Sequence, residues 1–151
     1  MEKGVIIMKG EYKRFDSKLY NLHDNVKKNI LDYFTQKGIK ADINADKYGP
    51  DLVVVLNSTE YYCEVQQKMA WKGETFPYSE LNIEERKEKF LNLDKPILFC
   101  VVNADKSHAL FTTGKIVSSC PKKSISNKNI SQGELFFRVP IEKTKRVRLS
   151  A

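Results

Sequence analysis

The spacing of apolar residues predicts alternating helices and strands along the first part of the chain. Apolar residues recur at helical intervals over 16–38, where Asp16 or Ser17 can cap a helix and Gly38 can end it. A short strand is expected at "KADIN". The apolar run "DLVVVLN" and the returning strand "YYCEVQQKM" follow with the turn-like "NSTE" between them, so they predict a hairpin.

The pattern after the hairpin predicts one more helix and several strands. The helix is expected over "LNIEERKEKFLNL", and Pro96 opens the apolar strand "ILFCVVN". Further strands are expected at "HALFTT", "ELFFRVPI" and "KRVRLS", whereas the polar "SSCPKKSISNKNISQGE" is expected to be a loop. This order favours an α/β or α+β class, with a mixed central sheet flanked by helices.

Length and composition favour a single intracellular domain. The chain has 151 residues, 41% of them apolar, which is enough for one hydrophobic core. Apolar runs such as "LVVVL" are too short to span a bilayer, and the first ten residues lack the long apolar segment of a signal peptide. Cys63, Cys100 and Cys120 lack the spacing of a zinc site and suit a reducing compartment. We therefore expect a cytoplasmic protein, and a phage- or virus-encoded origin is compatible with this.

The positive charge is concentrated at the C-terminus. Residues 121–151 hold eight Lys or Arg against two Glu, a net of +6, whereas residues 1–120 hold 18 basic against 17 acidic side chains. Such a basic block is typical of a protein that binds a polyanion, most often nucleic acid, because Lys and Arg displace counterions from phosphates. The alternative interpretation is a solvated basic surface.

One strand of the predicted hairpin has a polar face. Side chains of a strand alternate between its two faces, so Glu64, Gln66 and Lys68 point the same way. A hairpin that closes at 58–59 pairs positions whose numbers sum to about 117, which brings Asp51 near Glu64. Two adjacent carboxylates repel each other unless a cation lies between them, and oxygen ligands suit Mg²⁺ or Mn²⁺. The pattern therefore predicts a metal site.

These residues resemble a known motif. Pro50-Asp51 at the start of one strand, followed by Glu64-Val65-Gln66 on the next, is similar to the motif of the PD-(D/E)xK nuclease superfamily. The resemblance covers about residues 16–103 and implies a restriction-endonuclease-like core of helix, three strands, helix and strand. It leaves a basic C-terminal extension with extra strands at about 104–151.

The resemblance implies a catalytic metal site. Asp51, Glu64 and the Val65 carbonyl would bind Mg²⁺ or Mn²⁺, and Asp24 on the first helix is the best candidate for a further ligand. The site would hydrolyse a phosphodiester by in-line attack of a metal-activated water.

The chain departs from the motif at its lysine. Gln66 occupies the position two residues after Glu64 where the superfamily usually has lysine. Lys68 lies one pleat further along the same face, and Lys87 on the next predicted helix is another candidate. Our order of preference for the group that orients the water or stabilises the developing charge is Lys68, then Gln66, then Lys87.

We interpret the chain as a small Mg²⁺-dependent nuclease acting on DNA. Its size resembles Holliday-junction resolvases more than large restriction enzymes, and the resemblance implies a homodimer and branched DNA as a substrate. The alternatives are a catalytically impaired nucleic-acid-binding protein with the same fold, and a nuclease for RNA or single strands. The residues expected to contact nucleic acid are Trp71, Lys72, Arg86, Lys87, Lys122, Lys123, Lys143, Lys145, Arg146 and Arg148.

Overall fold

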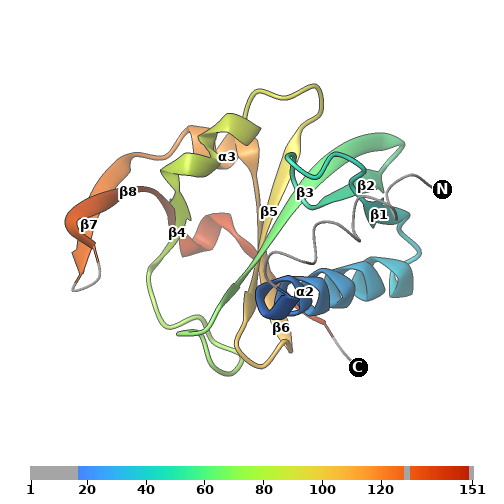
Figure 1. Cartoon of the computed structure of the whole chain (residues 1–151), viewed down its shortest axis with the longest axis horizontal. Helices are drawn as coiled ribbons and strands as arrows, with labels where there is room; N and C mark the ends of the chain where they lie inside the picture. Colours follow the sequence, from blue (N-terminus) through green and yellow to red (C-terminus); the bar gives the residue numbers. More distant parts are fainter. Residues whose placement is uncertain (1–16, 128–129, 150–151) are drawn as a thin grey trace.

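The computed structural model describes the backbone of residues 17–127 and 130–149, and the side chains of 25–124 and 134–149 (Figure 1). Within these residues the strands form a six-stranded sheet, in the order β1-β2-β3-β5-β6-β9, and a three-stranded sheet, in the order β4-β8-β7. The expectation of a mixed central sheet in an α/β chain is confirmed, because β3 and β5 are parallel and the other pairs of the large sheet are antiparallel.

Helix α2 (Ser17–Gln36) confirms the first predicted helix. It ends where Gly38 adopts a φ of 72°, a left-handed conformation that costs glycine little. The Ile39 N–H then donates to the Phe34 carbonyl at 2.8 Å and the Gly38 N–H to the Thr35 carbonyl at 3.0 Å, the pattern of a Schellman ending. The helix therefore stops where the sequence predicts, one turn before the first strand.

The predicted hairpin forms the start of the large sheet. Strands β1 (Ala41–Ile43), β2 (Leu52–Leu56) and β3 (Thr59–Lys68) are consecutive neighbours. The turn is Asn57–Ser58, whose φ values of 50° and 68° are those of a type I′ turn. The pairs run from Leu56 opposite Thr59 to Leu52 opposite Cys63, so paired numbers sum to 115. The predicted sum was about 117, because the turn was expected at 58–59. The turn lies one residue earlier, at 57–58, which lowers the sum by two.

Strand β5 (Ile97–Asn103) is buried on both faces and divides the core in two. Leu98, Cys100 and Val102 pack with Val26, Ile30 and Phe34 of α2. Ile97, Phe99 and Val101 pack with Leu81, Ile83 and Phe137 of the small sheet. Helix α2 thus covers one face of the large sheet and the small sheet covers the other, while β6 (His108–Thr113) and β9 (Lys145–Arg148) complete the far edge.

The prediction of a second helix over residues 81–93 is wrong. Its first half is strand β4 (Glu80–Glu84), and only the 3-10 helix η1 (Glu85–Phe90) follows. Leu81 and Ile83 alternate with polar residues and are buried against the large sheet, a period of two that only a strand accommodates. Strand β8 supplies the antiparallel partner that a local reading of the sequence does not contain.

The polar segment expected to be a loop is also partly a strand. Helix α3 (Gly114–Ser118) is followed by β7 (Lys122–Asn127), which pairs with the start of β8 (Ile130–Pro140). This hairpin extends to one end of the molecule (Figure 1). The 3-10 helix η2 (Ile141–Lys143) then leads to β9. None of the helices in the described ranges is long and apolar enough to cross a membrane.

Candidate active site

Two carboxylates meet where β2 begins. Asp51 immediately precedes β2, and extending the β2–β3 pairing by one position places it directly opposite Glu64. Residues that face each other across a pair of strands point to the same side of the sheet. The two carboxyl groups are within hydrogen-bonding reach of each other. Their side chains are largely buried, with exposed fractions of 17% for Asp51 and 15% for Glu64.

Asp51 is fixed by two donors. Its Oδ2 accepts the Val65 N–H at 2.9 Å, and its Oδ1 lies 3.2 Å from Lys27 Nζ of α2. The side chain of Asp51 thus takes the place of a backbone acceptor for β3, just before the first residue of β2. Lys27 was not among the residues predicted for the site. Lys27 lies beside the apolar stripe of α2, four residues before Leu31, and the sequence gives no sign that it reaches the start of β2.

Pro50 leaves one carbonyl of β3 available. In the extended register Pro50 lies opposite Val65, whose N–H points toward the β2 side because it donates to Asp51. The N–H and carbonyl of one strand residue point to the same neighbouring strand, and proline has no N–H to donate. Pro50 therefore cannot donate a backbone hydrogen bond to the Val65 carbonyl.

Burial changes the acidity of Glu64. Desolvation, and then the adjacent charge of Asp51, raise the pKa of its carboxyl to about 7 from an ordinary value of 4.5, although Lys87 acts in the opposite direction. A pKa raised in this way shows that the ionised form is incompletely compensated. A cation between Asp51 and Glu64 would relieve that deficit.

Lys87 is the lysine that reaches this site. It enters from η1 and is 7% exposed, and its Nζ donates to Glu64 Oε2 at 3.1 Å and to Gln66 Oε1 at 2.9 Å. Glu84 Oε1 lies 3.9 Å away. The ammonium group is therefore held beside Gln66, the position at which the resemblance expects a lysine.

Lys68, the first sequence-based choice, lies elsewhere. Its Nζ is 5.6 Å from the ring centre of Tyr78, and its side chain lines a cavity next to the small sheet. The structure therefore places Lys87, and not Lys68, in contact with both Glu64 and Gln66. Asp24 belongs to α2, one turn before Lys27, but its side chain lies outside the described residues.

The expectation that Trp71 stacks on a base is wrong. Its side chain is fully buried, and its ring packs edge-on against Phe76 with the centroids 5.4 Å apart. The loop from β3 to β4 folds back over the second core, and a large apolar ring is more stable there than in water. Lys72, the next residue, is exposed.

Several of the predicted basic contacts are already paired with carboxylates. Arg86 donates to Glu84 at 2.8 Å, Lys122 to Glu85 at 2.8 Å, and Arg146 to Glu74 at 3.2 Å. These pairs are largely exposed and a competing phosphate could replace them. The exposed basic residues Lys123, Lys143, Lys145 and Arg148 make no ion pair among the described residues.

The oxygen atoms of the site fit a hard divalent cation. Asp51 and Glu64 lie close together, and Mg²⁺ commonly takes one or two carboxylates and completes its shell with water and substrate phosphates. No cluster of three or more His, Cys, Asp or Glu side chains suited to a metal occurs in the described part of the chain. A weakly held ion, completed by the substrate, is what this donor set would support.

No protein-family profile and no curated protein sequence matches the chain. Among solved structures, the fold is similar to Hjc, a Holliday junction resolvase from the archaeal hyperthermophile Archaeoglobus fulgidus. The identity is 12%, the TM-score is 0.48, and the match covers 83% of this chain and 82% of that one.

Proposed function

We propose that the protein is a metal-dependent nuclease that hydrolyses phosphodiester bonds in DNA. The observation that carries this proposal is the group formed by Asp51, Glu64 and Lys87: two adjacent, largely buried carboxylates with a buried ammonium 3.1 Å from one of them. An ion pair that only stabilises the fold seldom places a second carboxylate where its charge disfavours the ionised form of the first. A site that receives a cation and a phosphate requires that arrangement.

The roles follow from the contacts. When bound, Mg²⁺ or Mn²⁺ would supply a water of lowered pKa and offset charge on the scissile phosphate. Asp51 and Glu64 would hold the ion, with the Val65 carbonyl as a third protein ligand and Asp24 as a candidate from α2. If Glu64 bound the ion, Lys87 would still donate a hydrogen bond to Gln66. Its ammonium group would therefore stay in place to stabilise the charge that develops on the phosphate.

We propose that the substrate is DNA, and branched DNA is among the forms to test. We also propose that the active unit is a homodimer. The test is a cleavage panel of four-way junction, duplex, flap and single-stranded DNA and RNA, each with Mg²⁺, Mn²⁺ or EDTA. We expect metal-dependent cleavage of at least one DNA substrate, and sedimentation of the active species as a dimer.

Conservative substitutions at the carboxylates provide the control. Asp51→Asn and Glu64→Gln preserve size and should abolish cleavage while the circular dichroism spectrum is unchanged. Wild-type turnover in either variant would contradict the assignment. Metal-independent DNA binding without cleavage of any substrate would favour a catalytically impaired binding protein, and cleavage restricted to RNA or single strands would correct the substrate.

A further inference from the structure

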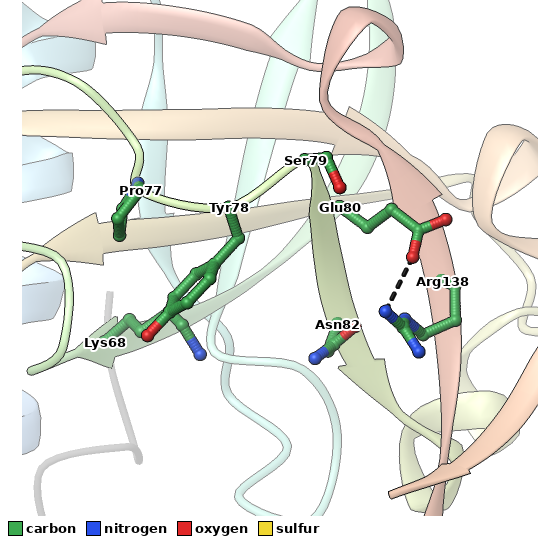
Figure 2. A pocket seen from close by; sticks show the side chains of 7 residues that line it. All are labelled: Lys68, Pro77, Tyr78, Ser79, Glu80, Asn82 and Arg138. Carbon is green, nitrogen blue, oxygen red and sulfur yellow. Dashed lines mark ion pairs between the residues drawn. The ribbon is translucent and has the colours of Figure 1, made fainter.

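A second polar site lies beside the candidate active site. A cavity of about 470 Å³ opens between β3 and the small sheet, lined by Lys68 of β3, the loop 77–79, Glu80 and Asn82 of β4, and Arg138 of β8 (Figure 2). Its volume is within the range of small-molecule sites. The hydrolytic chemistry proposed for Asp51, Glu64 and Lys87 does not use it.

The cavity and the candidate active site share one face of β3. Glu64 and Lys68 are four residues apart, so their side chains point the same way, about 13 Å apart along the strand. On β4, Asn82 and Glu84 also share a face, and Glu84 is the residue that approaches Lys87 at 3.9 Å. Both strands therefore continue without interruption from the carboxylates to the cavity.

The cavity presents uncompensated donors. Glu80 is neutralised by Arg138, with 2.7 Å between Oε1 and the guanidinium nitrogen, whereas Lys68 is within ion-pair distance of no carboxylate in the described ranges. Figure 2 shows the Lys68 ammonium and the Asn82 amide nitrogen pointing into the space between them. Two donors that converge on one space, one of them charged, suit an anion with several acceptor oxygens.

Two buried polar atoms in the wall of the cavity have no hydrogen-bond partner among the described residues. They are Asn82 Oδ1 and Arg138 Nε, for which the described part of the chain supplies no hydrogen bond. The two residues are opposite each other in the β4–β8 pair, so both orphaned atoms belong to the same stretch of wall. Buried polar atoms are nearly always satisfied in a surface that is only structural, and each orphan costs about 1–3 kcal/mol.

We propose that this cavity binds a phosphate of the nucleic-acid strand, a few nucleotides from the scissile phosphate, with Lys68 and Asn82 donating to its oxygens. The remaining volume accommodates the attached sugar, beside the half-exposed ring of Tyr78. The inference rests on the proposed nuclease function and deepens it: Lys68 positions the strand, and it takes no part in bond cleavage.

The test is a scan of single phosphates in a non-cleaving protein. Asp51→Asn, alone or with Lys68→Gln, is titrated by fluorescence anisotropy with duplex oligonucleotides that carry one neutral methylphosphonate at each position in turn. We expect the Asp51→Asn protein to lose about tenfold in affinity at one phosphate away from the scissile position. In the protein that also carries Lys68→Gln, the methylphosphonate at that position should not change the affinity. With Lys68→Arg in place of Lys68→Gln, the loss of affinity should return.

Lys40→Gln is the matched control, because it removes an exposed lysine that precedes β1, the edge strand two positions from β3 in the large sheet. The slope of log affinity against log salt should fall by about 0.9 with Lys68→Gln and stay unchanged with Lys40→Gln. Equal slopes, or a scan with the same profile with and without Lys68, would overturn the proposal even if the wild type cleaves DNA. Binding of inorganic phosphate at Lys68 without a position-specific effect in the scan would also overturn it. A Lys68-dependent phosphate contact would sustain it even if no substrate is cleaved.

Discussion

At the scale of single residues, the group formed by Asp51, Glu64 and Lys87 leaves the charge of Glu64 only partly compensated. The two neighbours act on the Glu64 carboxylate in opposite directions: the charge of Asp51 repels it, and the Lys87 ammonium, 3.1 Å away, attracts it. Lys87 in turn is shared with Gln66. A residue whose only task was to stabilise the fold would not need this sharing, since an apolar pair of similar volume is often more stable.

Lys87 should therefore be needed for the chemical step. Lys87→Ala should lower kcat by about 10²-fold or more, because the ammonium stabilises charge that develops in the transition state. Lys68→Ala should raise KM and leave kcat nearly unchanged. The measurement is steady-state cleavage of the best substrate of the panel with saturating Mg²⁺. A loss of kcat in Lys68→Ala together with full activity in Lys87→Ala would restore the original order of preference.

The raised pKa of Glu64 predicts a pH-dependent stability in the absence of metal. The folded protein binds the proton more tightly than the unfolded chain, so this contribution is fully present below about pH 4.5 and is lost as the pH rises through about 7. Glu64→Gln imitates the protonated form. In EDTA at pH 8.5 it should therefore be more stable than the wild type, by at most about 3 kcal/mol.

Thermal unfolding in EDTA at pH 4.5 and pH 8.5 measures this difference. The gain in Tm from Glu64→Gln should be present at the higher pH and vanish at the lower one. Glu142→Gln, at an exposed position in η2, is the control and should change Tm little at either pH. A gain that is equal at both pH values would show that the Glu64 carboxylate is not under electrostatic stress.

At the scale of elements, the start of β2 determines which backbone groups of β3 remain available. Pro50 cannot donate to Val65, and Asp51 occupies the Val65 N–H with its side chain at 2.9 Å. A continuous ladder here would consume the carbonyl that we assign to the metal. The proline in the motif thus has a mechanical explanation, which is to stop the ladder one residue before the acid.

Pro50→Ala tests this explanation. The new N–H can pair with the Val65 carbonyl, so the affinity for Mn²⁺ should fall by about tenfold or more while the free energy of unfolding stays the same or rises. Titration calorimetry with Mn²⁺ measures the affinity. Pro96→Ala, at the start of β5, is the control and should leave it unchanged. Unaltered Mn²⁺ affinity in Pro50→Ala would remove the Val65 carbonyl from the proposed ligands.

The elements also show how far local patterns reach. The first helix, the hairpin and strand β5 could be predicted, because their caps, turn and apolar runs lie within the segments themselves. The stretch 81–93 could not, because its charged "EERKEKF" favours a helix and the strand partner of β4 lies more than fifty residues away in β8. The same non-local pairing orients η1, which is why the sequence alone favoured Lys68 and Gln66 over Lys87.

At the scale of the whole molecule, the basic C-terminal segment is separated from the candidate active site. Strand β9 is three positions from β3 in the large sheet, about 14 Å across it. Lys145, Arg146 and Arg148 lie exposed on this edge strand, and Lys143 lies in the preceding turn. Charged edge strands also prevent sheets from pairing edge to edge, so the charges admit two explanations.

Replacement of four basic residues distinguishes DNA binding from edge protection. If Lys143, Lys145, Arg146 and Arg148 bind phosphates, changing all four to Gln should weaken binding to duplex DNA and lower the salt slope by about 0.9 for each phosphate that is no longer neutralised. The matched control changes Lys28, Lys37, Lys40 and Lys115 to Gln, which removes the same charge from exposed positions elsewhere in the fold. Anisotropy titrations from low to physiological salt measure both variants.

If both variants show the same decrease in slope, the edge attracts DNA only through the net charge of +7. If instead the first variant keeps its slope and sediments as larger species, the charges of β9 protect an edge, and the nucleic-acid interface is confined to the face that carries Glu64 and Lys68.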